Sequence, residues 1–525
     1  MTDPPNTMLV QVLIHYKNQD FPRAIEEAEA TAKLYPNSET IYSLLADLYS
    51  QTRDFKASIH YYKKAIEINP TNPQLYHLLG KSYFQNKEIN PAISSYKKAL
   101  AIDPNLAEVL NSLGNAYRKN EYHKISIECF RKAVSLRVGF YEAMNNLANV
   151  LKAIGKLDEA IEIFKEAILI KPSSATLHKN IATAFYEKNE IVNALSYLKD
   201  ALRIEPAYAD AELSKAFCEL KMFNFSEGWS SYEARWKTQG FDYLKTEKKE
   251  WYPGLSGKLF IWSEQGIGDE IMFASILEEL LQKVENVVLQ CDPRLIPIFR
   301  RSFDTKVSYI AKDSTCDNLS FDYILPIGSL PKYFRMNVSD FSRRKPAYLK
   351  AGEEISIKHQ TACMQNSKTT LLGISWNSTA KVTSATKRNL KLNDIIEILP
   401  LNCVQIVSLQ YGDHDAEISA AEEKFDIRIE RIHEIDKFNN IDGLLSCIQA
   451  CDEIITIDNV TVHLAGALGK QVYALLPFCC DWRWGLNEKE SLWYEHVSLF
   501  RQTSLGVWDD PLKKLQSRLL ENLAL

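Results

Sequence analysis

Small side chains recur at a fixed spacing along residues 5–208. Two columns of small residues repeat every 34 positions, and a third column in the same phase holds large apolar residues. The columns are Ala24, Ser58, Ala92, Ser126, Ala160 and Ala194; Thr31, Ala65, Ala99, Ala133, Ala167 and Ala201; and Tyr49, Tyr83, Tyr117, Leu151 and Phe185. Small residues let paired helices approach closely, and large residues fill the space between neighbouring pairs. The pattern predicts six helix pairs.

Prolines mark the ends of most of these units. They stand at Pro36, Pro70, Pro104, Pro172 and Pro206, and Val138 occupies the one remaining position. A 34-residue period with a terminal proline is typical of tetratricopeptide repeats. Residues 1–240 are therefore expected to form an all-α solenoid of six repeats and a degenerate cap. The aromatic residues within 227–236 suit a cap that packs on the next domain.

After residue 240 the helical spacing stops and short apolar runs replace it. Residues 241–257 are rich in Lys, Pro and Gly and are expected to be a linker. The expected strands are residues 258–262, 287–291 and 321–325, then, after a polar stretch at 351–368, residues 371–376, 403–409, 453–457 and 471–476. Apolar runs separated by helices predict parallel sheets with both faces covered. We expect two halves, 258–350 and 369–525, with a ligand cleft at the carboxyl ends of their strands.

A glycine-rich turn follows the first of these strands. Its sequence is Glu-Gln-Gly-Ile-Gly-Asp-Glu-Ile at 264–271. Gly266 and Gly268 permit a tight turn, and the following helix offers free N–H groups to an anion. Asp269 is either a catalytic acid or base, or a cap of that helix. The turn lacks the Gly-Lys-Ser/Thr of a Walker A loop and is not a full dinucleotide fingerprint.

A second polar loop follows the strand at 453–457. Asp458 to Thr461 would lie at the start of a helix rich in small residues, where the dipole favours phosphate. The alternative makes Asp458 an N-cap and His463 a buried core histidine. Lys381, Lys387 and Arg388 follow the strand at 371–376 and form either a diphosphate-neutralising group or a solvated basic loop. The aromatic residues at 481–484 and 493–494 favour packing over ligand stacking.

Together these motifs resemble the heptosyltransferase-like glycosyltransferases (family nine) in the subgroup fused to tetratricopeptide repeats. The resemblance covers residues 258–510 and rests on the motifs at 264–270, 408–413 (Ser-Leu-Gln-Tyr-Gly-Asp), 463–469, 481–484 and 493–494. It implies a multidomain chain with a glycosyltransferase-B fold of two Rossmann-like halves, a nucleotide-sugar donor, inversion at the sugar, and no metal or cofactor.

The resemblance also implies roles for individual residues. Asp269 matches the general base, and the family's Asp-Ser/Thr-Gly-x-x-His loop matches 458–463, although Asn459-Val460 replaces its Ser/Thr-Gly pair. The implied donor-binding residues are Gly266, Gly268, Trp376, Lys381, Lys387, Gln410, Asp458, Asn459, Thr461 and His463. Lys381 or Lys387, with the helix beginning near Asn459, would stabilise the departing diphosphate.

Charge and composition narrow the partners. The net charge is −5 and the pI is about 6.1, which argues against a nucleic-acid partner. No apolar run is long enough to span a membrane, and the first residues do not resemble a secretory signal. Ten scattered cysteines suit reduced thiols, so a cytoplasmic location is expected.

The repeats favour a protein acceptor, because extended solenoid surfaces suit polypeptides. Flagellin is one candidate acceptor, by analogy with similar fusions. Two alternatives stay open at this point. One is a non-catalytic scaffold with a degenerate sugar-nucleotide-binding domain, and the other is a glycosyltransferase that acts on a lipopolysaccharide-type glycolipid.

Overall fold

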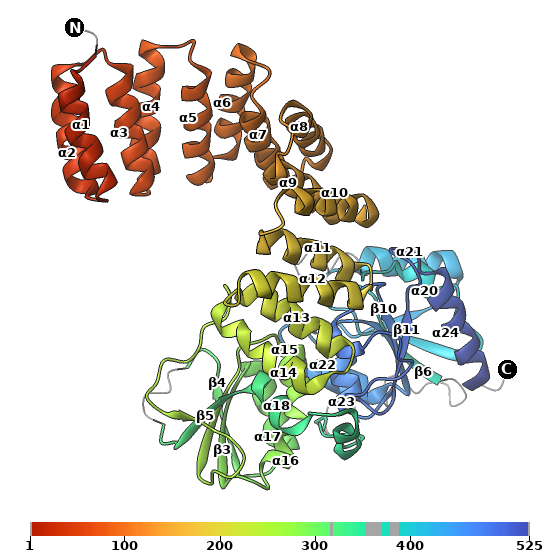
Figure 1. The fold of residues 1–525 in the computed structure, drawn as a ribbon. Coiled ribbons are helices and arrows are strands. Elements are labelled where there is room, and N and C mark those ends of the chain that lie inside the picture. The colour runs from red at the N-terminus through yellow and green to blue at the C-terminus, as the bar shows by residue number, and fades with distance from the viewer. Residues whose placement is uncertain (1–2, 315–318, 353–369, 379–387, 523–525) are drawn as a thin grey trace. The chain divides into compact units, whose positions relative to one another are not determined.

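The computed structural model describes residues 3–314, 319–352, 370–378 and 388–522 of the chain (Figure 1). Residues 1–185 form one unit and residues 186–525 form another. The first unit is built of helices alone, and the second contains helices and two parallel sheets. None of the described helices is long and apolar enough to cross a membrane.

The repeats are antiparallel helix pairs. Their helices are α1 (Asn6–Lys17), α2 (Phe21–Leu34), α3 (Glu39–Gln51), α4 (Phe55–Ile68), α5 (Pro73–Gln85), α6 (Ile89–Ile102), α7 (Ala107–Lys119), α8 (His123–Leu136), α9 (Tyr141–Ala153), α10 (Leu157–Ile170), α11 (Ala175–Glu187), α12 (Ile191–Ile204), α13 (Ala209–Lys221) and α14 (Phe225–Tyr232). Every residue of the two predicted small columns is buried. The six predicted units are confirmed, and α13 with α14 forms the degenerate seventh.

The turn inside each pair has one residue in the left-handed region. These residues lie 34 positions apart, with φ between 60° and 81°: Gln19, Arg53, Lys87, Glu121, Gly155, Asn189 and Phe223. A left-handed residue lets the chain reverse in few residues, although it is unfavourable for any residue but glycine. Only Gly155 among them is glycine, so residue type alone does not reveal this column. Phe223 shows that the seventh unit keeps the same turn.

Two parallel sheets form the core of the second unit. The first has the order β1-β5-β2-β3-β4, and the second has the order β11-β10-β9-β6-β7-β8. The strands are β1 (Lys249–Glu250), β2 (Lys258–Trp262), β3 (Asn286–Cys291), β4 (Val307–Ala311), β5 (Tyr323–Pro326), β6 (Thr370–Ser375), β7 (Val404–Ser408), β8 (Ile429–Arg431), β9 (Glu453–Ile457), β10 (Gln471–Leu476) and β11 (Val497–Arg501). The second order is that of a doubly wound sheet, with its switch point between β6 and β9.

Helices and short turns connect these strands. They are η1 (Glu233–Lys237), α15 (Ile267–Ala274), α16 (Leu277–Leu280), η2 (Pro293–Leu295), α17 (Ile296–Ser302), η3 (Ile327–Ser329), α18 (Pro331–Phe334), η4 (Val338–Arg343), α20 (Leu392–Ile396), α21 (Asp415–Phe425), α22 (Ile441–Ala450), α23 (Val460–Ala467), η5 (Trp482–Trp484) and α24 (Asp509–Asn522). Apolar residues of α15, α22 and α23 and of both sheets belong to one continuous core.

The predicted strands are present, but the sequence pattern missed β1, β4, β8 and β11. All four lie near or at sheet edges, and β1 and β8 are short, so their burial patterns are weak. The expected linker at 241–257 contains β1, which pairs with β5 and so adds an edge strand to the first sheet. Trp251 is fully buried there and stacks on Phe334. The expected polar stretch at 351–368 falls mostly outside the described residues.

Candidate active site

The turn after β2 carries the first motif. Gly266 is the N-cap of α15, with extended backbone and no side-chain cap. Asp269 lies in the first turn of α15, and the backbone N–H of Gly266 also bonds to its carboxylate. The Asp269 side chain is 21% exposed, so it remains accessible at the carboxyl edge of the first sheet.

The loop between β9 and α23 carries the second motif. Asn459 is the N-cap of α23, and its side-chain oxygen accepts from the Thr461 N–H at 2.9 Å. Its amide nitrogen donates to Ser375 Oγ, also at 2.9 Å, and so ties the end of β9 to the end of β6. Thr461 is fully buried and Asp458 nearly so. The predicted helix start is present, and a side chain of the protein already caps it.

The two motifs meet because α15 packs against α23. A Cβ added to Gly268 would lie 2.8 Å from Cδ2 and 3.2 Å from Nε2 of His463, so glycine is needed at this contact. Arg483, in η5 after β10, forms an ion pair with Asp269. The structure therefore confirms that the turn at 266–269 faces the loop at 458–463. Their roles in catalysis and donor binding stay predictions.

In the part of the chain that the structure describes, three carboxylates and two guanidinium groups gather at this meeting point. Arg483 pairs with Asp269 and, at 3.1 Å, with Asp481. Arg388 Nη1 donates to the backbone oxygen of Asp458 at 2.7 Å and lies 3.8 Å from its Oδ2. The charge of Arg483 also acts on Asp458. With every acid ionised, this cluster carries one negative charge in excess.

Burial shifts the titration of these groups. It raises the pKa of the Asp269 carboxyl, although the Arg483 charge opposes the shift. It also raises the pKa of Asp458, against the charges of Arg483 and Arg388. Burial and the same two arginines hold the pKa of His463 well below its ordinary value, so this imidazole is neutral. A carboxylate with a raised pKa at an accessible position is suited to accept a proton.

A hydrogen-bond chain sets the tautomer of His463. Tyr348 donates its hydroxyl proton to the Ile271 carbonyl at 2.9 Å, so its oxygen accepts from Tyr494. The Tyr494 oxygen, 2.8 Å from His463 Nδ1, must then accept the imidazole proton. Nε2 of His463 keeps a lone pair on the side of Gly268. In this state Nε2 can accept a hydrogen bond but has no proton to donate to a phosphate.

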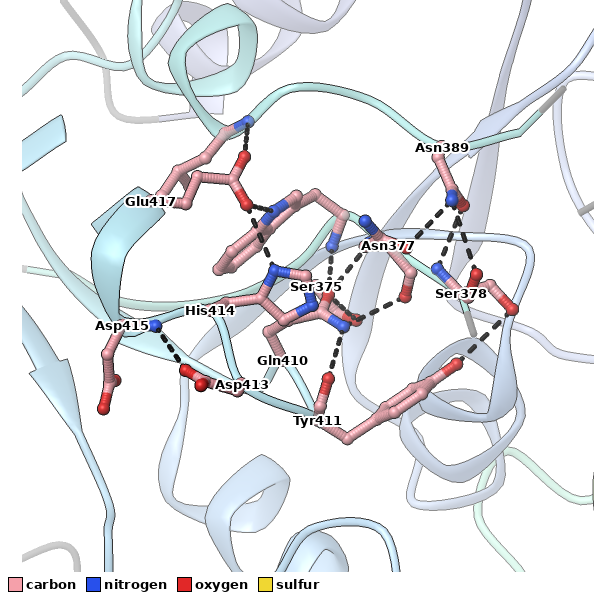
Figure 2. Close-up of polar contacts among 12 residues, drawn as sticks. Ser375, Asn377, Ser378, Asn389, Gln410, Tyr411, Asp413, His414, Asp415 and Glu417 are labelled. Carbon is pink, nitrogen blue, oxygen red and sulfur yellow. Dashed lines mark hydrogen bonds and ion pairs between the residues drawn. The ribbon is translucent and has the colours of Figure 1, made fainter. Parts of the chain in front are cut away.

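Two other predicted donor-binding residues organise the loops after β6 and β7. The carbonyl oxygen of Gln410 accepts from the backbone N–H groups of Trp376 and Asn377, both at 2.9 Å, and its amide donates to the Asn377 carbonyl oxygen (Figure 2). Trp376 is fully buried, and its indole N–H donates to Glu417 at 3.0 Å. Both side chains hold the carboxyl edge of the second sheet together, and a direct contact with a donor stays a prediction.

A pocket of about 240 Å³ lies beside this loop, at the carboxyl ends of β7 and β8. Its walls come from residues within 408–418 and 431–437, and they include Gln410, Asp413, His414, Arg431 and Asp436. His414 Nδ1 lies 3.1 Å from Glu417, which links the pocket wall to α21 (Figure 2). The motif at 408–413 therefore forms one side of a polar pocket at the edge where doubly wound sheets bind ligands.

The end of the repeats contacts the glycine turn after β2 and the segment around η5, all within the second unit. Arg235, fully buried in η1, donates to Glu264 at 3.1 Å, immediately before the glycine turn. Lys221, at the end of α13, donates to the Cys480 carbonyl oxygen at 3.0 Å, just before η5. Trp229 of α14 packs edge-on against Trp482. The predicted packing of the aromatic cap on the next domain is confirmed.

Lys381 and Lys387, the predicted diphosphate cations, lie outside the described residues. Among the described residues, Arg388 and Arg483 bring positive charge to the site. Sequence reasoning missed the role of Arg483, because the motif at 481–484 indicated aromatic packing. Trp482 and Trp484 are indeed buried, and the arginine between them faces Asp269.

Comparison with protein families identifies the N-terminal part. A family model described as "TPR repeat" matches residues 54–87 and 80–121, and a "Tetratricopeptide repeat" model matches residues 107–137 and 141–174. The N-terminal helices are tetratricopeptide repeats. The crystal structure of the MamA protein is 31% identical and covers 33% of this chain and 93% of its own, with a TM-score of 0.30.

Two further relatives match larger shares of the chain. Protein FlbA of Caulobacter vibrioides is 28% identical over 334 residues, which are 59% of this chain and 54% of FlbA. The chain thus spans about half the length of this curated relative. A tetratricopeptide repeat protein from Parabacteroides merdae is 15% identical and covers 45% of this chain and 93% of its own, with a TM-score of 0.40.

Proposed function

We propose that residues 186–525 transfer a sugar from a nucleotide-sugar donor to an acceptor hydroxyl. The observation that carries this proposal is the position of Asp269, an accessible carboxylate of the first sheet that faces the ligand-binding edge of the second. Two parallel sheets whose carboxyl edges face each other are compatible with a glycosyltransferase-B fold. The polar pocket at β7 and β8 has the place and lining expected for the nucleoside part of a donor.

The proposed reaction inverts the anomeric carbon. The acceptor oxygen attacks that carbon and forms the new C–O bond, while Asp269 takes the hydroxyl proton. The bond between the anomeric carbon and the diphosphate oxygen breaks, and its electron pair leaves with the nucleoside diphosphate. Arg388, which donates to the backbone of Asp458 after β9, adds positive charge where that leaving group would develop its negative charge.

We further propose that the repeats bind a polypeptide acceptor. Half-buried asparagines form hydrogen bonds between successive repeats: Asn146 donates to Asn111 at 2.9 Å, and Asn180 donates to Asn145 at 2.8 Å. Each primary amide still has groups that can donate and accept, which is what the backbone of an extended peptide requires. An uncharged amide row suits a peptide backbone better than the charged head of a glycolipid, and so favours a protein acceptor.

Intact-mass analysis of candidate acceptors tests this proposal. Each candidate, flagellin among them, is co-expressed with the wild-type chain, with Asp269→Asn, or alone. We expect a mass increase of one or more sugar residues with the wild type only. An unchanged mass for every acceptor, together with no donor hydrolysis by the purified protein, would favour the non-catalytic scaffold. Modification of a glycolipid but no protein would favour the lipopolysaccharide-type enzyme.

A further inference from the structure

Arg483 is held between the two halves of the candidate site. It lies in η5, directly after the loop that leaves β10 at the carboxyl edge of the second sheet. One end of its guanidinium pairs with Asp269 of the first half, and the other pairs with Asp481 at 3.1 Å. Its Nε–H is buried without a hydrogen-bond partner among the described residues. An unsatisfied buried donor is costly, and a ligand oxygen would satisfy it.

We propose that Arg483 binds the diphosphate of the donor and that this diphosphate displaces the Asp269 carboxylate from it. Donor binding would then free the candidate base to accept the acceptor proton. The inference rests on the proposed function, because it assigns a further residue to the same site. It makes Arg483 a catalytic residue with two exchangeable partners, Asp269 and phosphate.

The charges of the described residues favour this exchange. Among the described residues, two guanidinium groups face three carboxylates, so with every acid ionised a diphosphate entering the cluster meets one excess negative charge. Asp269 competes directly with the incoming phosphate for the Nη2 donor of Arg483. Neutralising Asp269 removes both the competitor and the excess charge. Removing the base should therefore strengthen diphosphate binding, an outcome that a simple supporting contact would not produce.

Calorimetry on the full chain tests the exchange, with inorganic pyrophosphate, UDP, GDP and ADP as probes. We expect Asp269→Asn to bind the preferred probe roughly 5- to 30-fold more tightly than the wild type, as expected when a close competing charge is removed. Arg483→Gln should bind it at least about tenfold more weakly, because phosphate loses its charge-assisted hydrogen bonds. Asp269→Asn is nearly isosteric and leaves Arg483 paired with Asp481, so it tests the exchange even if Arg483→Gln fails to fold.

Asp442→Asn provides a matched control. Asp442 of α22 forms a two-bond ion pair with Arg301 of α17, so it also joins the two halves, and its side chain is 24% exposed. This variant should leave probe affinity unchanged. If the wild type binds a probe and Asp269→Asn binds it equally or more weakly, the exchange is wrong while the proposed function stands. If neither protein binds any probe, both proposals are wrong.

Discussion

At the scale of single residues, the central question is whether Asp269 accepts the proton of the acceptor hydroxyl. Its carboxyl is partly exposed, and burial raises its pKa. Asp269→Asn keeps the shape and removes the proton acceptor, so we expect sugar transfer to fall by about 10²- to 10⁴-fold. The melting temperature should stay close to that of the wild type. Transfer assays with a labelled donor measure the loss, and full activity of the variant would leave Asp269 as a helix cap only.

We expect a buried histidine to make the repeats sensitive to acid. Burial lowers the pKa of His77 from its ordinary value to about 4, with the Lys81 charge adding to the shift. Between the two pKa values the unfolded chain binds a proton that the folded chain refuses, so stability falls as pH drops from about 6.5 to about 4. The loss reaches about 2 kcal/mol at pH 5 for a shift of this size.

The His77→Gln variant tests this effect. Gln keeps a polar group near Ser112, which lies 3.0 Å from His77 Nε2, and cannot titrate. Urea unfolding followed by circular dichroism at pH 7 and pH 5 should show a smaller loss of repeat stability for the variant. Equal losses in both proteins would show that other groups cause the acid sensitivity.

At the scale of elements, the contact between α15 and α23 requires glycine, which has no side chain, at position 268. Gly268 faces His463, which is held by Tyr494 and stacks on Trp484, so it cannot move aside. Gly268→Ala should therefore destabilise the second unit by roughly 1–3 kcal/mol through overpacking. Thermal unfolding measures this change.

Gly266→Ala is the matched control, because it lies two residues away on the same turn. Its added Cβ would come no closer than 3.5 Å to Oδ2 of Asp269, and its φ of −78° suits alanine. Its melting temperature should stay near that of the wild type. Equal destabilisation by both substitutions would mean that turn flexibility, and not the approach to His463, is what matters.

At the scale of the whole molecule, the seventh repeat continues the repeat pattern and also forms part of the core around the two sheets. Its turn follows the repeat pattern, with Phe223 in the left-handed region. Its apolar residues Phe225, Trp229 and Tyr232 belong to the same core as the two sheets. Phe225 packs 5.0 Å from Phe341, ring centre to ring centre. The boundary at residue 240 stays a prediction. Because the seventh repeat packs into the core of the second unit, the part of the solenoid that folds alone is expected to end before it.

Two fragments test that boundary. Residues 1–187, which end with α11, should be helical, monomeric and cooperative in a thermal melt. Residues 1–240 should also be helical but should expose the apolar face of α14, and so bind a hydrophobic dye or self-associate. Light scattering and dye fluorescence distinguish the two. A monomeric 1–240 fragment without dye binding would show that the solenoid ends at 240 as an independent domain.

The sequence by itself determined the repeats and most of the strands. Side-chain size repeats every 34 residues, because each repeat makes the same close helix contacts at Ala24, Ala65 and their equivalents. Runs such as 258–262 and 471–476 are apolar because both faces of a parallel sheet are covered. Short edge strands such as β1 and β8 have no such run, so they were not predicted.

Only the tertiary structure decided which charges meet at the site. Asp269 and Arg483 are far apart in the chain, and no periodicity links a glycine turn to an arginine between two tryptophans. Likewise, the sequence predicts ligand contacts for Asn459 and Gln410, and only the fold shows that their amides also join neighbouring loops. Local patterns record burial and turn geometry, which depend on near neighbours. The partners of a polar group depend on which loops the packing of two sheets brings together.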